Sequence, residues 1–354
     1  MPEPLRIVAW STGDVGTRAI RAIHARPDLD LVGVWVHSPD KEGRDAGELS
    51  GIGPVGVAAT NDVDGLLALK PDCVCFSASD GMGGDGFVDD YERILIAGVN
   101  VVSSSTPGLL FPAGYDEVAR ARLEKAAQAG GATFYSSGIE PGFAGDQLVL
   151  TLLTLTRKLR RVVAQEIFLY DKMPVTFTMF DVFGFGHPLE YEPLITLPGV
   201  QTATWGPVVR MIAGALGEEL DEIRETFERD LSHRRIEVAA GVIEPGTVGT
   251  VRMATIGVVN GEEAIVVEHV SRMAPDLAPH WPAAPRDGTY RILVDGEPSV
   301  SCDLVIGADD AAASDSGMEA TTMRIVNAIP AVCAAPPGLT TSLDLPLTLP
   351  RHAF

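Results

Sequence analysis

A glycine-containing turn near the start of the chain constrains the fold more than any other feature. The run Leu5–Trp10 is apolar and β-prone, and a helical segment follows from Gly16 to Ala25. Between them, Gly13 would let the backbone approach a phosphate, and Gly16 would let the helix pack closely on the strand. The free N–H groups at the helix N-terminus would then bind the phosphates of a dinucleotide. Ser11 stands where the usual G-x-G-x-x-G pattern has its first glycine, so the prediction depends on the strand–turn–helix context. An ordinary βα turn is the alternative.

The end of the second strand decides which dinucleotide we expect. The run Leu29–Val36 ends in His37 and Ser38, whereas NAD-dependent enzymes usually place Asp or Glu there to hold the ribose 2′-hydroxyl. Ser38 could donate a hydrogen bond to a 2′-phosphate, and His37, Lys41 or Arg44 could supply charge, unless the last two are solvated loop charges. We therefore expect NADP(H), with NAD(H) as the alternative. The cofactor-binding residues predicted along the first strands are Ser11, Thr12, Gly13, Asp14, Val15, Gly16, His37, Ser38, Lys41, Arg44, Ser77, Ala78, Ser104 and Thr106.

The two parts of the chain follow different patterns. Through residue 145, short β-prone runs alternate with helix-length segments, which is typical of βαβ units and a parallel sheet. Beyond residue 146, extended runs follow one another, and Asn260-Gly261 between two of them indicates a hairpin. We therefore predict an α/β Rossmann domain (residues 1–145), an α+β domain with a mixed or antiparallel sheet (146–317) and a C-terminal segment (318–354). The charged run Leu220–Leu231 predicts a helix in the second domain.

Composition narrows the function classes. The 354-residue chain has 27 Lys and Arg against 48 Asp and Glu, a net charge of −21. So acidic a chain has no basic footprint for nucleic acid and would be repelled by anionic membranes. No membrane helix or secretory signal is visible, and the 4 cysteines form neither a disulfide framework nor a zinc spacing. We expect a cytoplasmic enzyme that acts on a small molecule, with no nucleic-acid, membrane or metal partner.

Four stretches resemble, in the same order, a known family of oxidoreductases. They are the loop His37–Leu49, the turn Gly138–Asp146 and the segments Phe180–Gly186 and Val326–Pro330. They are similar to dihydrodipicolinate-reductase-like proteins, and more narrowly to the branch of 2,4-diaminopentanoate dehydrogenase and the native amine dehydrogenases. The resemblance implies a Rossmann domain completed by the C-terminal tail, with Asn327 at the cofactor, and a sheet domain that covers the nicotinamide and forms a homodimer. It also implies reversible hydride transfer between the nicotinamide and a C=N or C=O carbon.

Two positions depart from the family pattern. The amine dehydrogenases carry a C-E-E-like segment whose glutamate is thought to handle ammonia, and its two glutamates align here with Pro107 and Gly108, so that carboxylate is missing. Conversely, Glu140 stands where the family usually has Asn. Glu140 follows a predicted parallel strand, at the edge where open α/β sheets bind ligands, and a partly buried glutamate there would have a raised pKa suited to acid or base catalysis. The alternatives are that Glu140 caps the next helix or holds the carboxamide of the nicotinamide.

The other candidate catalytic residues are Tyr170, His187 and His269. His187 lies at a turn beside aromatic residues, while His269 lies in an apolar strand, where a histidine is more often a satisfied sheet residue than a proton donor. The segment Tyr170–Phe185 is rich in Phe, Met and Tyr at helical spacing, which predicts a helix that faces either the core or the substrate pocket. The predicted pocket residues are Phe143, Tyr170, Phe177 and Phe180.

The charge pattern of this segment bears on the substrate. No Arg or Lys lies between Lys172 and Arg210, so a dicarboxylate substrate is disfavoured, and with it dihydrodipicolinate reductase itself. We expect an NAD(P)H-dependent oxidoreductase that acts on an apolar or amino ketone, imine or amine. The alternatives are a carbonyl reductase without amine chemistry and a nicotinamide-binding regulatory protein without turnover.

Overall fold

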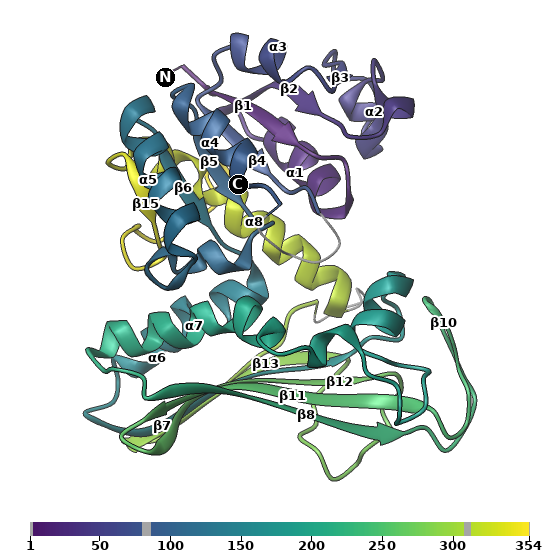
Figure 1. The fold of residues 1–354 in the computed structure, drawn as a ribbon. Helices are drawn as coiled ribbons and strands as arrows, with labels where there is room; N and C mark the ends of the chain where they lie inside the picture. Colours follow the sequence, from purple (N-terminus) through teal and green to yellow (C-terminus); the bar gives the residue numbers. More distant parts are fainter. Residues whose placement is uncertain (1–2, 80–85, 308–312, 354) are drawn as a thin grey trace. The chain divides into compact units, whose positions relative to one another are not determined.

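The chain divides into two compact units. The computed structural model describes residues 3–79, 86–307 and 313–353. Unit 1 comprises Met1–Ile139 and Met318–Phe354, and unit 2 comprises Glu140–Gly317. Each unit has its own sheet (Figure 1). No helix among the described residues is long and apolar enough to cross a membrane.

Unit 1 is built on a parallel sheet, which in the described part of the chain has seven strands in the order β15-β6-β5-β4-β1-β2-β3 (Figure 1). The strands are β1 (Leu5–Trp10), β2 (Leu29–Trp35), β3 (Ala59–Thr60), β4 (Cys73–Phe76), β5 (Asn100–Ser103), β6 (Thr133–Ser136) and β15 (Gly338–Thr340). Strand β1 pairs with β2 on one side and β4 on the other, so the strand order reverses beside β1. Doubly wound sheets bind dinucleotides at the carboxyl end of such a reversal. The predicted Rossmann fold is confirmed.

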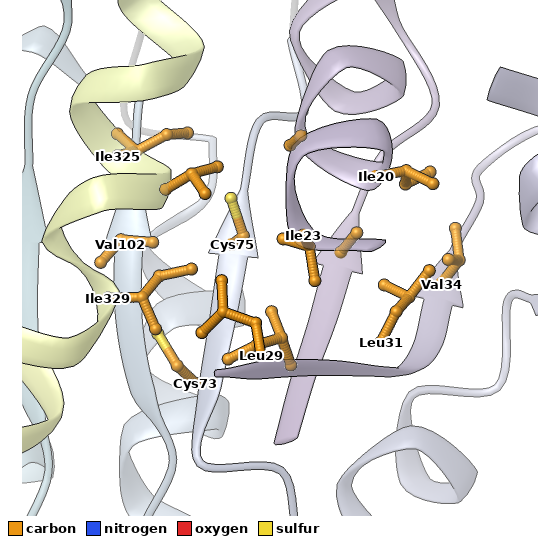
Figure 2. Packing of buried hydrophobic residues seen from close by; sticks show 14 of the residues in the cluster. Ile20, Ile23, Leu29, Leu31, Val34, Cys73, Cys75, Val102, Ile325 and Ile329 are labelled. Atoms are coloured by element: carbon orange, nitrogen blue, oxygen red, sulfur yellow. The ribbon is translucent and has the colours of Figure 1, made fainter. Parts of the chain in front are cut away.

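Helices cover both faces of this sheet. They are α1 (Asp14–His24), α2 (Ala46–Ser50), α3 (Val63–Ala68), α4 (Val88–Ile96), α5 (Glu117–Gly130) and α8 (Ala313–Ala334), with short turns η1 (Pro39–Lys41), η2 (Pro107–Leu110) and η3 (Pro112–Gly114). Figure 2 shows Ile20 and Ile23 of α1 together with Ile325 and Ile329 of α8 in one core against the strands. Each of these isoleucines is completely buried, which stabilises the fold by about 1.5–3 kcal/mol per side chain.

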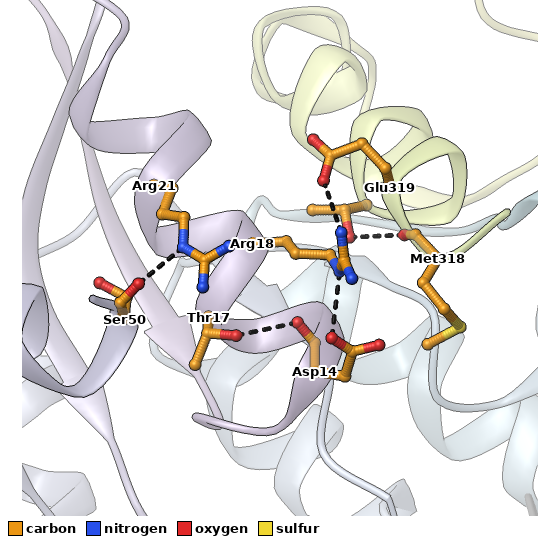
Figure 3. A network of polar contacts seen from close by, with 8 residues as sticks. Asp14, Thr17, Arg18, Arg21, Ser50, Met318 and Glu319 are labelled. Carbon is orange, nitrogen blue, oxygen red and sulfur yellow. Dashed lines mark hydrogen bonds and ion pairs between the residues drawn. The ribbon is translucent and has the colours of Figure 1, made fainter. Parts of the chain in front are cut away.

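Polar contacts join α1 to the C-terminal helix. Arg18 of α1 forms ion pairs at 3.1 Å both with Asp14, one turn earlier, and with Glu319 of α8 (Figure 3). Arg21 donates a 2.6 Å hydrogen bond to the carbonyl of Ser50, which ties α1 to α2. These contacts hold α1 on both sides and therefore fix the helix whose N-terminus follows the glycine turn.

Unit 2 contains a mixed sheet, in which the described residues form six strands in the order β14-β13-β7-β12-β11-β8. These are β7 (Lys158–Leu169), β8 (Glu222–Leu231), β11 (Val248–Val259), β12 (Glu262–Arg272), β13 (Gly288–Glu297) and β14 (Val300–Leu304), and a separate hairpin consists of β9 (Ile236–Val238) and β10 (Gly241–Ile243). Strands β7 and β12 are parallel, and the remaining pairs are antiparallel. Asn260 and Gly261 have φ of 53° and 80° and join β11 to β12, as the hairpin signal predicts. The expected mixed sheet is confirmed.

Two expectations about local structure are wrong. The run Leu220–Leu231 is not a helix, because Glu222–Leu231 forms the edge strand β8, whose residues alternate between exposed and half-buried. An edge strand can keep many charged side chains in water, so its charge imitated a solvated helix. The segment Tyr170–Phe185 is not one helix either, because only Phe177–Val182 (η5) is helical and Tyr170 continues directly from β7.

The sheet of unit 2 has two unlike faces. Figure 1 shows α6 (Gln147–Leu153) and α7 (Val200–Leu216) along one of them, which we call the helix-covered face. Glu166 of β7 and His269 of β12 are register partners, and His269 lies on this face because its ring is 4.5 Å from that of Trp205 in α7. Successive strand residues point to opposite faces. The preceding pair, Gln165 and Glu268, therefore lies on the opposite face.

Candidate functional site

The glycine turn of unit 1 borders a cavity. The cavity has a volume of about 360 Å³ and is lined by Ser11, Thr12, Gly13, Trp35, His37, Ser38, Lys41, Ala78, Ser79 and Phe87. The structure thus brings together the cofactor residues predicted in the turn, those predicted at the end of the second strand, and Ala78. No Asp or Glu is among these lining residues. Among the described residues, the lining therefore supplies no carboxylate that would hold a ribose 2′-hydroxyl and repel a 2′-phosphate.

The backbone of the turn explains why its residues stand where they do. Ser11 has φ of 113°, a conformation usual for glycine, and its Oγ accepts a 3.1 Å hydrogen bond from the N–H of Gly13. A Cβ on Gly16 would lie 2.3 Å from the carbonyl oxygen of Ser11, whereas a Cβ on Gly13 would meet only the Ser11 Oγ at 3.5 Å. Gly16 is therefore required by packing, while Gly13 leaves open space at the N-terminus of α1.

Positive charge is fixed beside this open space. The Nζ of Lys41 donates to the Oγ1 of Thr12 at 3.1 Å and to its carbonyl at 3.4 Å. These two hydrogen bonds connect the loop after β2 to the glycine turn. Backbone donors, a lysine and the hydroxyls of Ser38 and Thr12 in one cavity match the phosphates of a nicotinamide dinucleotide. The residues present fit that cofactor.

Other residues predicted for the cofactor have different surroundings. Asp14, Val15 and Gly16 form the first turn of α1, and Arg44 is exposed. The Ser77 Oγ donates to the Trp10 carbonyl at 3.4 Å, and the Ser104 N–H donates to the Phe76 carbonyl at 3.1 Å. Each of these contacts holds the ends of neighbouring strands together.

Thr106 and Asn327 are used within the fold of unit 1. The Thr106 Oγ1 is 3.0 Å from the Tyr91 hydroxyl, and Thr106 is only 1% exposed. The Oδ1 of Asn327 accepts a 3.3 Å hydrogen bond from Arg26. In this structure both side chains therefore have polar partners inside unit 1.

A second group of polar residues is buried in unit 2 around Glu140. The turn Ile139–Phe143 (η4) places it, and the φ of 145° at Gly142 is one that favours glycine. The Glu140 side chain is 4% exposed, and its Oε1 lies 3.7 Å from the Nε2 of His269. At that distance no hydrogen bond forms, and the Oε1 has no hydrogen-bond partner within the described residues.

The surroundings of Glu140 favour its neutral form. Burial is the main cause that raises its pKa well above the ordinary value, and the charges of Glu166 and Asp146 raise it further. Burial likewise raises the pKa of Glu166 to about 7, although the hydrogen bond that Tyr170 donates to Glu166 partly opposes this shift. Burial and the charges of Glu166 and Glu140 raise the pKa of Tyr290. A carboxyl with a strongly raised pKa thus accompanies a second carboxyl whose pKa is about 7.

His269 is neutral in these surroundings. Burial lowers its pKa to about 3, and its ring packs against Trp205 at 4.5 Å between centroids. Its contact with Glu140 is therefore not an ion pair near neutral pH, because the imidazole carries no charge there. A neutral imidazole can donate from one ring nitrogen and accept at the other.

The structure brings together only some of the predicted catalytic and pocket residues. Tyr170 joins the cluster of Glu140 and His269 through Glu166. His187 does not, because its ring stacks on Tyr191 at 3.8 Å and 11°.

The predicted pocket residues are spread over two turns. Phe143 ends the turn of Glu140. Phe177 is 43% exposed, and Phe180 packs so closely that a Cβ on Gly186 would come within 2.6 Å of its ring. The Phe180 ring therefore packs against the turn at Gly186.

The sequence prediction missed Glu166 and Tyr290. Glu166 lies in the middle of β7, in the otherwise apolar run Val162–Leu169. Two adjacent polar residues, Gln165 and Glu166, interrupt that run, and this interruption was the available signal. Tyr290 gave no comparable signal, because a tyrosine is common in strands. Among the described residues, no three His, Cys, Asp or Glu side chains are arranged to hold a metal ion.

Both parts of the chain match known protein families. Residues 7–136 match the family described as dihydrodipicolinate reductase, N-terminus. Residues 143–352 match the family described as 2,4-diaminopentanoate dehydrogenase C-terminal domain. These two matches cover the strands and turns that supply the cavity of unit 1 and most of unit 2.

Similar proteins are known over the full length. The chain is 38% identical over 345 residues to a protein named amine dehydrogenase from Streptomyces virginiae, a match that covers 96% of each chain. It is 23% identical over 266 residues to 2,4-diaminopentanoate dehydrogenase from Acetoanaerobium sticklandii, and this match covers 73% of this chain and 70% of that enzyme. The solved structure of amine dehydrogenase from Mycobacterium smegmatis has a TM-score of 0.80 at 20% identity and covers 99% of this chain and 98% of that one. At that identity the likeness shows a shared fold.

Proposed function

Because the chain belongs to the 2,4-diaminopentanoate dehydrogenase family of NAD(P)-dependent oxidoreductases, we propose that it transfers hydride at the carbon of a C–N bond. The substrate is an apolar or amino-substituted primary amine in one direction and the corresponding ketone or imine in the other. The family inferred from four short stretches is confirmed. Supporting the choice of amine chemistry, a relative named amine dehydrogenase shares 38% identity over almost the whole chain.

One observation carries this proposal, the buried and unpartnered carboxyl of Glu140. Buried polar atoms in native proteins nearly always have a hydrogen-bond partner, and an exception calls for an explanation. The Glu140 Oε1 has none among the described residues, while burial and the charges of Glu166 and Asp146 raise the pKa of the group well above its ordinary value. Perturbed acids of this kind are typical of functional sites. Glu140 also follows β6 by only four residues, at the carboxyl end of a parallel strand.

The residues of unit 2 have a defined task in such a reaction. When bound, the nicotinamide supplies or accepts the hydride. In the direction of amination, a ketone, an ammonium ion and NAD(P)H become a primary amine, water and NAD(P)⁺. Glu140 donates a proton to the oxygen that leaves as water, and in the reverse direction its carboxylate accepts that proton. A positioned general acid of this kind contributes about 10²–10⁴-fold to the rate.

The test of the reaction is a panel of ketones assayed by NADPH absorbance with and without ammonium, together with amines assayed in the oxidative direction. We expect ketone turnover only when ammonium is present, and amine oxidation without it. Turnover of ketones regardless of ammonium would instead establish the carbonyl reductase, which the presence of Pro107 and Gly108 at the family glutamate position favours. Tight cofactor binding with no turnover on any member of the panel would establish the regulatory protein.

We propose further that NADP(H) is the preferred cofactor. The support is Lys41, whose Nζ is bonded to Thr12 of the glycine turn, and the lack of Asp or Glu among the described residues that line the cavity. Calorimetric titration should give a lower Kd for NADP⁺ than for NAD⁺, and Lys41→Ala should remove most of the difference. Arg44→Ala is the matched control, because Arg44 is exposed and is not among the lining residues. Equal or tighter binding of NAD⁺ would contradict the preference.

The assembly and location inferred from the sequence remain proposals. The family resemblance implies a homodimer formed through the sheet of unit 2, and the composition is typical of a cytoplasmic enzyme. Light scattering coupled to size-exclusion chromatography should give twice the mass of the chain. A monomer that retains full activity would contradict the dimer.

A further inference from the structure

The polar atoms around Glu140 are short of partners. Besides the Glu140 Oε1, the indole Nε1 of Trp205 is buried without a hydrogen bond among the described residues. Glu166 is 8% exposed and receives a hydrogen bond from Tyr170, while Tyr290 is 3% exposed. A buried polar atom without a partner is costly, because it has given up its hydrogen bonds to water.

The electrostatics of this place are one-sided. The charges that act on Glu140 come from Glu166 and Asp146, and both raise its pKa. The charges that act on Tyr290 come from Glu166, which also acts on Glu140, and from Glu140 itself. No cation contributes to either group within the described residues. A negative potential in a low-dielectric place is an attractive site for a small cation.

The chemistry of these buried residues indicates which kind of cation would bind. The described residues offer no arrangement of three metal-ligating side chains, so a divalent metal is disfavoured. An ammonium group donates three or four N–H bonds in a tetrahedral arrangement and suits a carboxylate, a phenol oxygen and aromatic faces. The Tyr170 hydroxyl donates to Glu166, and Tyr290 of β13 is the register partner of Glu166, so two phenol groups lie beside this carboxylate.

We propose that Glu166, with the Tyr290 hydroxyl and beside Glu140, forms a binding site for an ammonium nitrogen, either free ammonium or the amino group of the substrate. The proposal rests on the proposed function for its role, but the site itself is defined by unit 2 alone. It assigns charge recognition to Glu166 and proton transfer to Glu140. It also places the nitrogen-binding carboxylate on β7, not at Pro107 and Gly108.

A second glutamate of the same sheet provides the matched control. Glu268 is 6% exposed, against 8% for Glu166, and lies one register step away on the opposite face. Its carboxylate accepts hydrogen bonds of 2.9 and 2.6 Å from Arg252. Since Arg252 already supplies its cation, Glu268 should have no affinity for ammonium.

The experiment is a titration of the full-length protein without added cofactor, just above neutral pH and at constant ionic strength. Ammonium chloride is compared with potassium chloride, because potassium has a similar radius but no N–H donors. Calorimetry and thermal unfolding should both report saturable binding of ammonium and none of potassium. Ethylammonium and tetramethylammonium are the further arms. Binding of ethylammonium would assign the site to the substrate amino group, and binding of ammonium alone would assign it to the free ion.

Variants decide whether the proposed residues form the site. Glu166→Gln should weaken ammonium binding at least about tenfold, which is what one hydrogen bond to a charged group contributes. Tyr290→Phe should weaken it less, and Glu268→Gln should bind as the wild type does. Ammonium that stabilises no more than potassium, or that binds Glu166→Gln unchanged, would overturn the proposal. If Glu166→Gln did not fold, unchanged binding by Tyr290→Phe would overturn it.

Failure of this site and failure of the proposed function are distinguishable. Amine oxidation that depends on Glu140, in a protein that binds no ammonium, would remove the ammonium site and leave the function. Saturable ammonium binding that depends on Glu166, in a protein that oxidises no amine, would retain the site and remove the function.

Discussion

Two glutamates on neighbouring strands of unit 2 are buried to a similar degree and meet opposite surroundings. On the opposite face, Glu268 accepts hydrogen bonds from Arg252 and from Gln165. On the helix-covered face, Glu166 has one neutral donor, Tyr170, and its charge raises the pKa of a second carboxyl, Glu140. Glutamates that are buried to a similar degree on adjacent strands therefore differ in their partners. On one face the carboxylate has an arginine as its counter-charge, and on the other a cluster of acids has no cation among the described residues, which we call the uncompensated acid cluster.

This difference distinguishes a buried carboxylate that the fold itself stabilises from one for which the fold provides no partner. Removing a carboxylate from water costs several kcal/mol unless a cation and hydrogen bonds replace the lost hydration. Arg252 and Gln165 do this for Glu268, so this group has a sufficient structural explanation. Among the described residues, no cation or hydrogen-bond donor does it for the Glu140 Oε1, which is why we propose that this group serves a ligand or a reaction. The predictions below change one face at a time.

The largest effect is expected from Glu140→Gln. The substitution keeps the size and hydrogen-bonding capacity of the side chain but removes the transferable proton. We expect kcat for amine oxidation to fall about 10²–10⁴-fold while the Kd of the cofactor changes little. The control on the opposite face, Glu268→Gln, should leave kcat nearly unchanged. A Glu140→Gln enzyme with wild-type kcat would show that this carboxyl is not the proton donor.

The second prediction removes the cation that pairs with Glu268 on the opposite face. Arg252→Met would leave Glu268 buried without its cation, and a buried pair that loses one partner is destabilised by about 3–5 kcal/mol. Because the Arg252 side chain is 33% exposed, we expect a loss of roughly 3 kcal/mol in the free energy of unfolding. Urea denaturation measures this loss, and kcat should be retained. A loss of activity in a folded Arg252→Met protein would break the distinction between the faces.

The two faces should also differ in how stability depends on pH. An acid with a higher pKa in the folded than in the unfolded chain binds more protons when folded, so the free energy of unfolding decreases as pH rises between the two values. For Glu166 these values are 4.5 and about 7, which corresponds to on the order of 3 kcal/mol. Glu166→Gln should therefore remove this decrease and be more stable than the wild type above pH 7. An unchanged pH profile would contradict the uncompensated burial of Glu166.

His269 should act with the opposite sign. Its pKa is lowered from 6.5 to about 3, so the folded chain binds fewer protons between these values. The free energy of unfolding should therefore decrease as pH falls from 6.5 toward 3. His269→Gln should remove this acid-side loss, as urea denaturation at a series of pH values would measure. A profile identical to that of the wild type would mean that His269 is solvated.

The smallest effect concerns Tyr170→Phe. The hydroxyl of Tyr170 lowers the pKa of Glu166 by donating to it, and the loss of one such hydrogen bond costs about 1–2 kcal/mol. We expect that loss above neutral pH, where Glu166 is ionised, and a smaller loss in acid. Equal losses at both pH values would mean that the bond does not depend on the charge of Glu166.

The sequence was most informative about features that depend on backbone conformation. The turn around Gly13 and Gly16, together with the alternation of strands and helices, predicted the Rossmann sheet and the turn residues that line its cavity, because steric needs of the backbone select glycine at particular steps. It was less informative about β8, because the charged side chains of an edge strand look like those of a solvated helix.

The acid cluster was predictable only in part. Glu140 and His269 could be proposed from the ends and patterns of single elements. Glu166 and Tyr290 could not, because their role depends on strand register across β7, β12 and β13 and on which face α7 covers. That a neighbouring glutamate has its arginine, while Glu166 has none, is a property of tertiary pairing and is absent from any local pattern.

The most direct test of the uncompensated cluster is the protonation state of Glu140 itself. Carbon-13 NMR titration of glutamate carboxyls, with Glu140→Gln used to assign the signal, follows this group without any substrate or cofactor. We expect the Glu140 carboxyl to remain protonated at neutral pH and to ionise only at higher pH, as its burial beside Glu166 and Asp146 requires. A Glu140 signal that titrates near 4.5, the ordinary value for glutamate, would contradict the account of the helix-covered face as the reactive one.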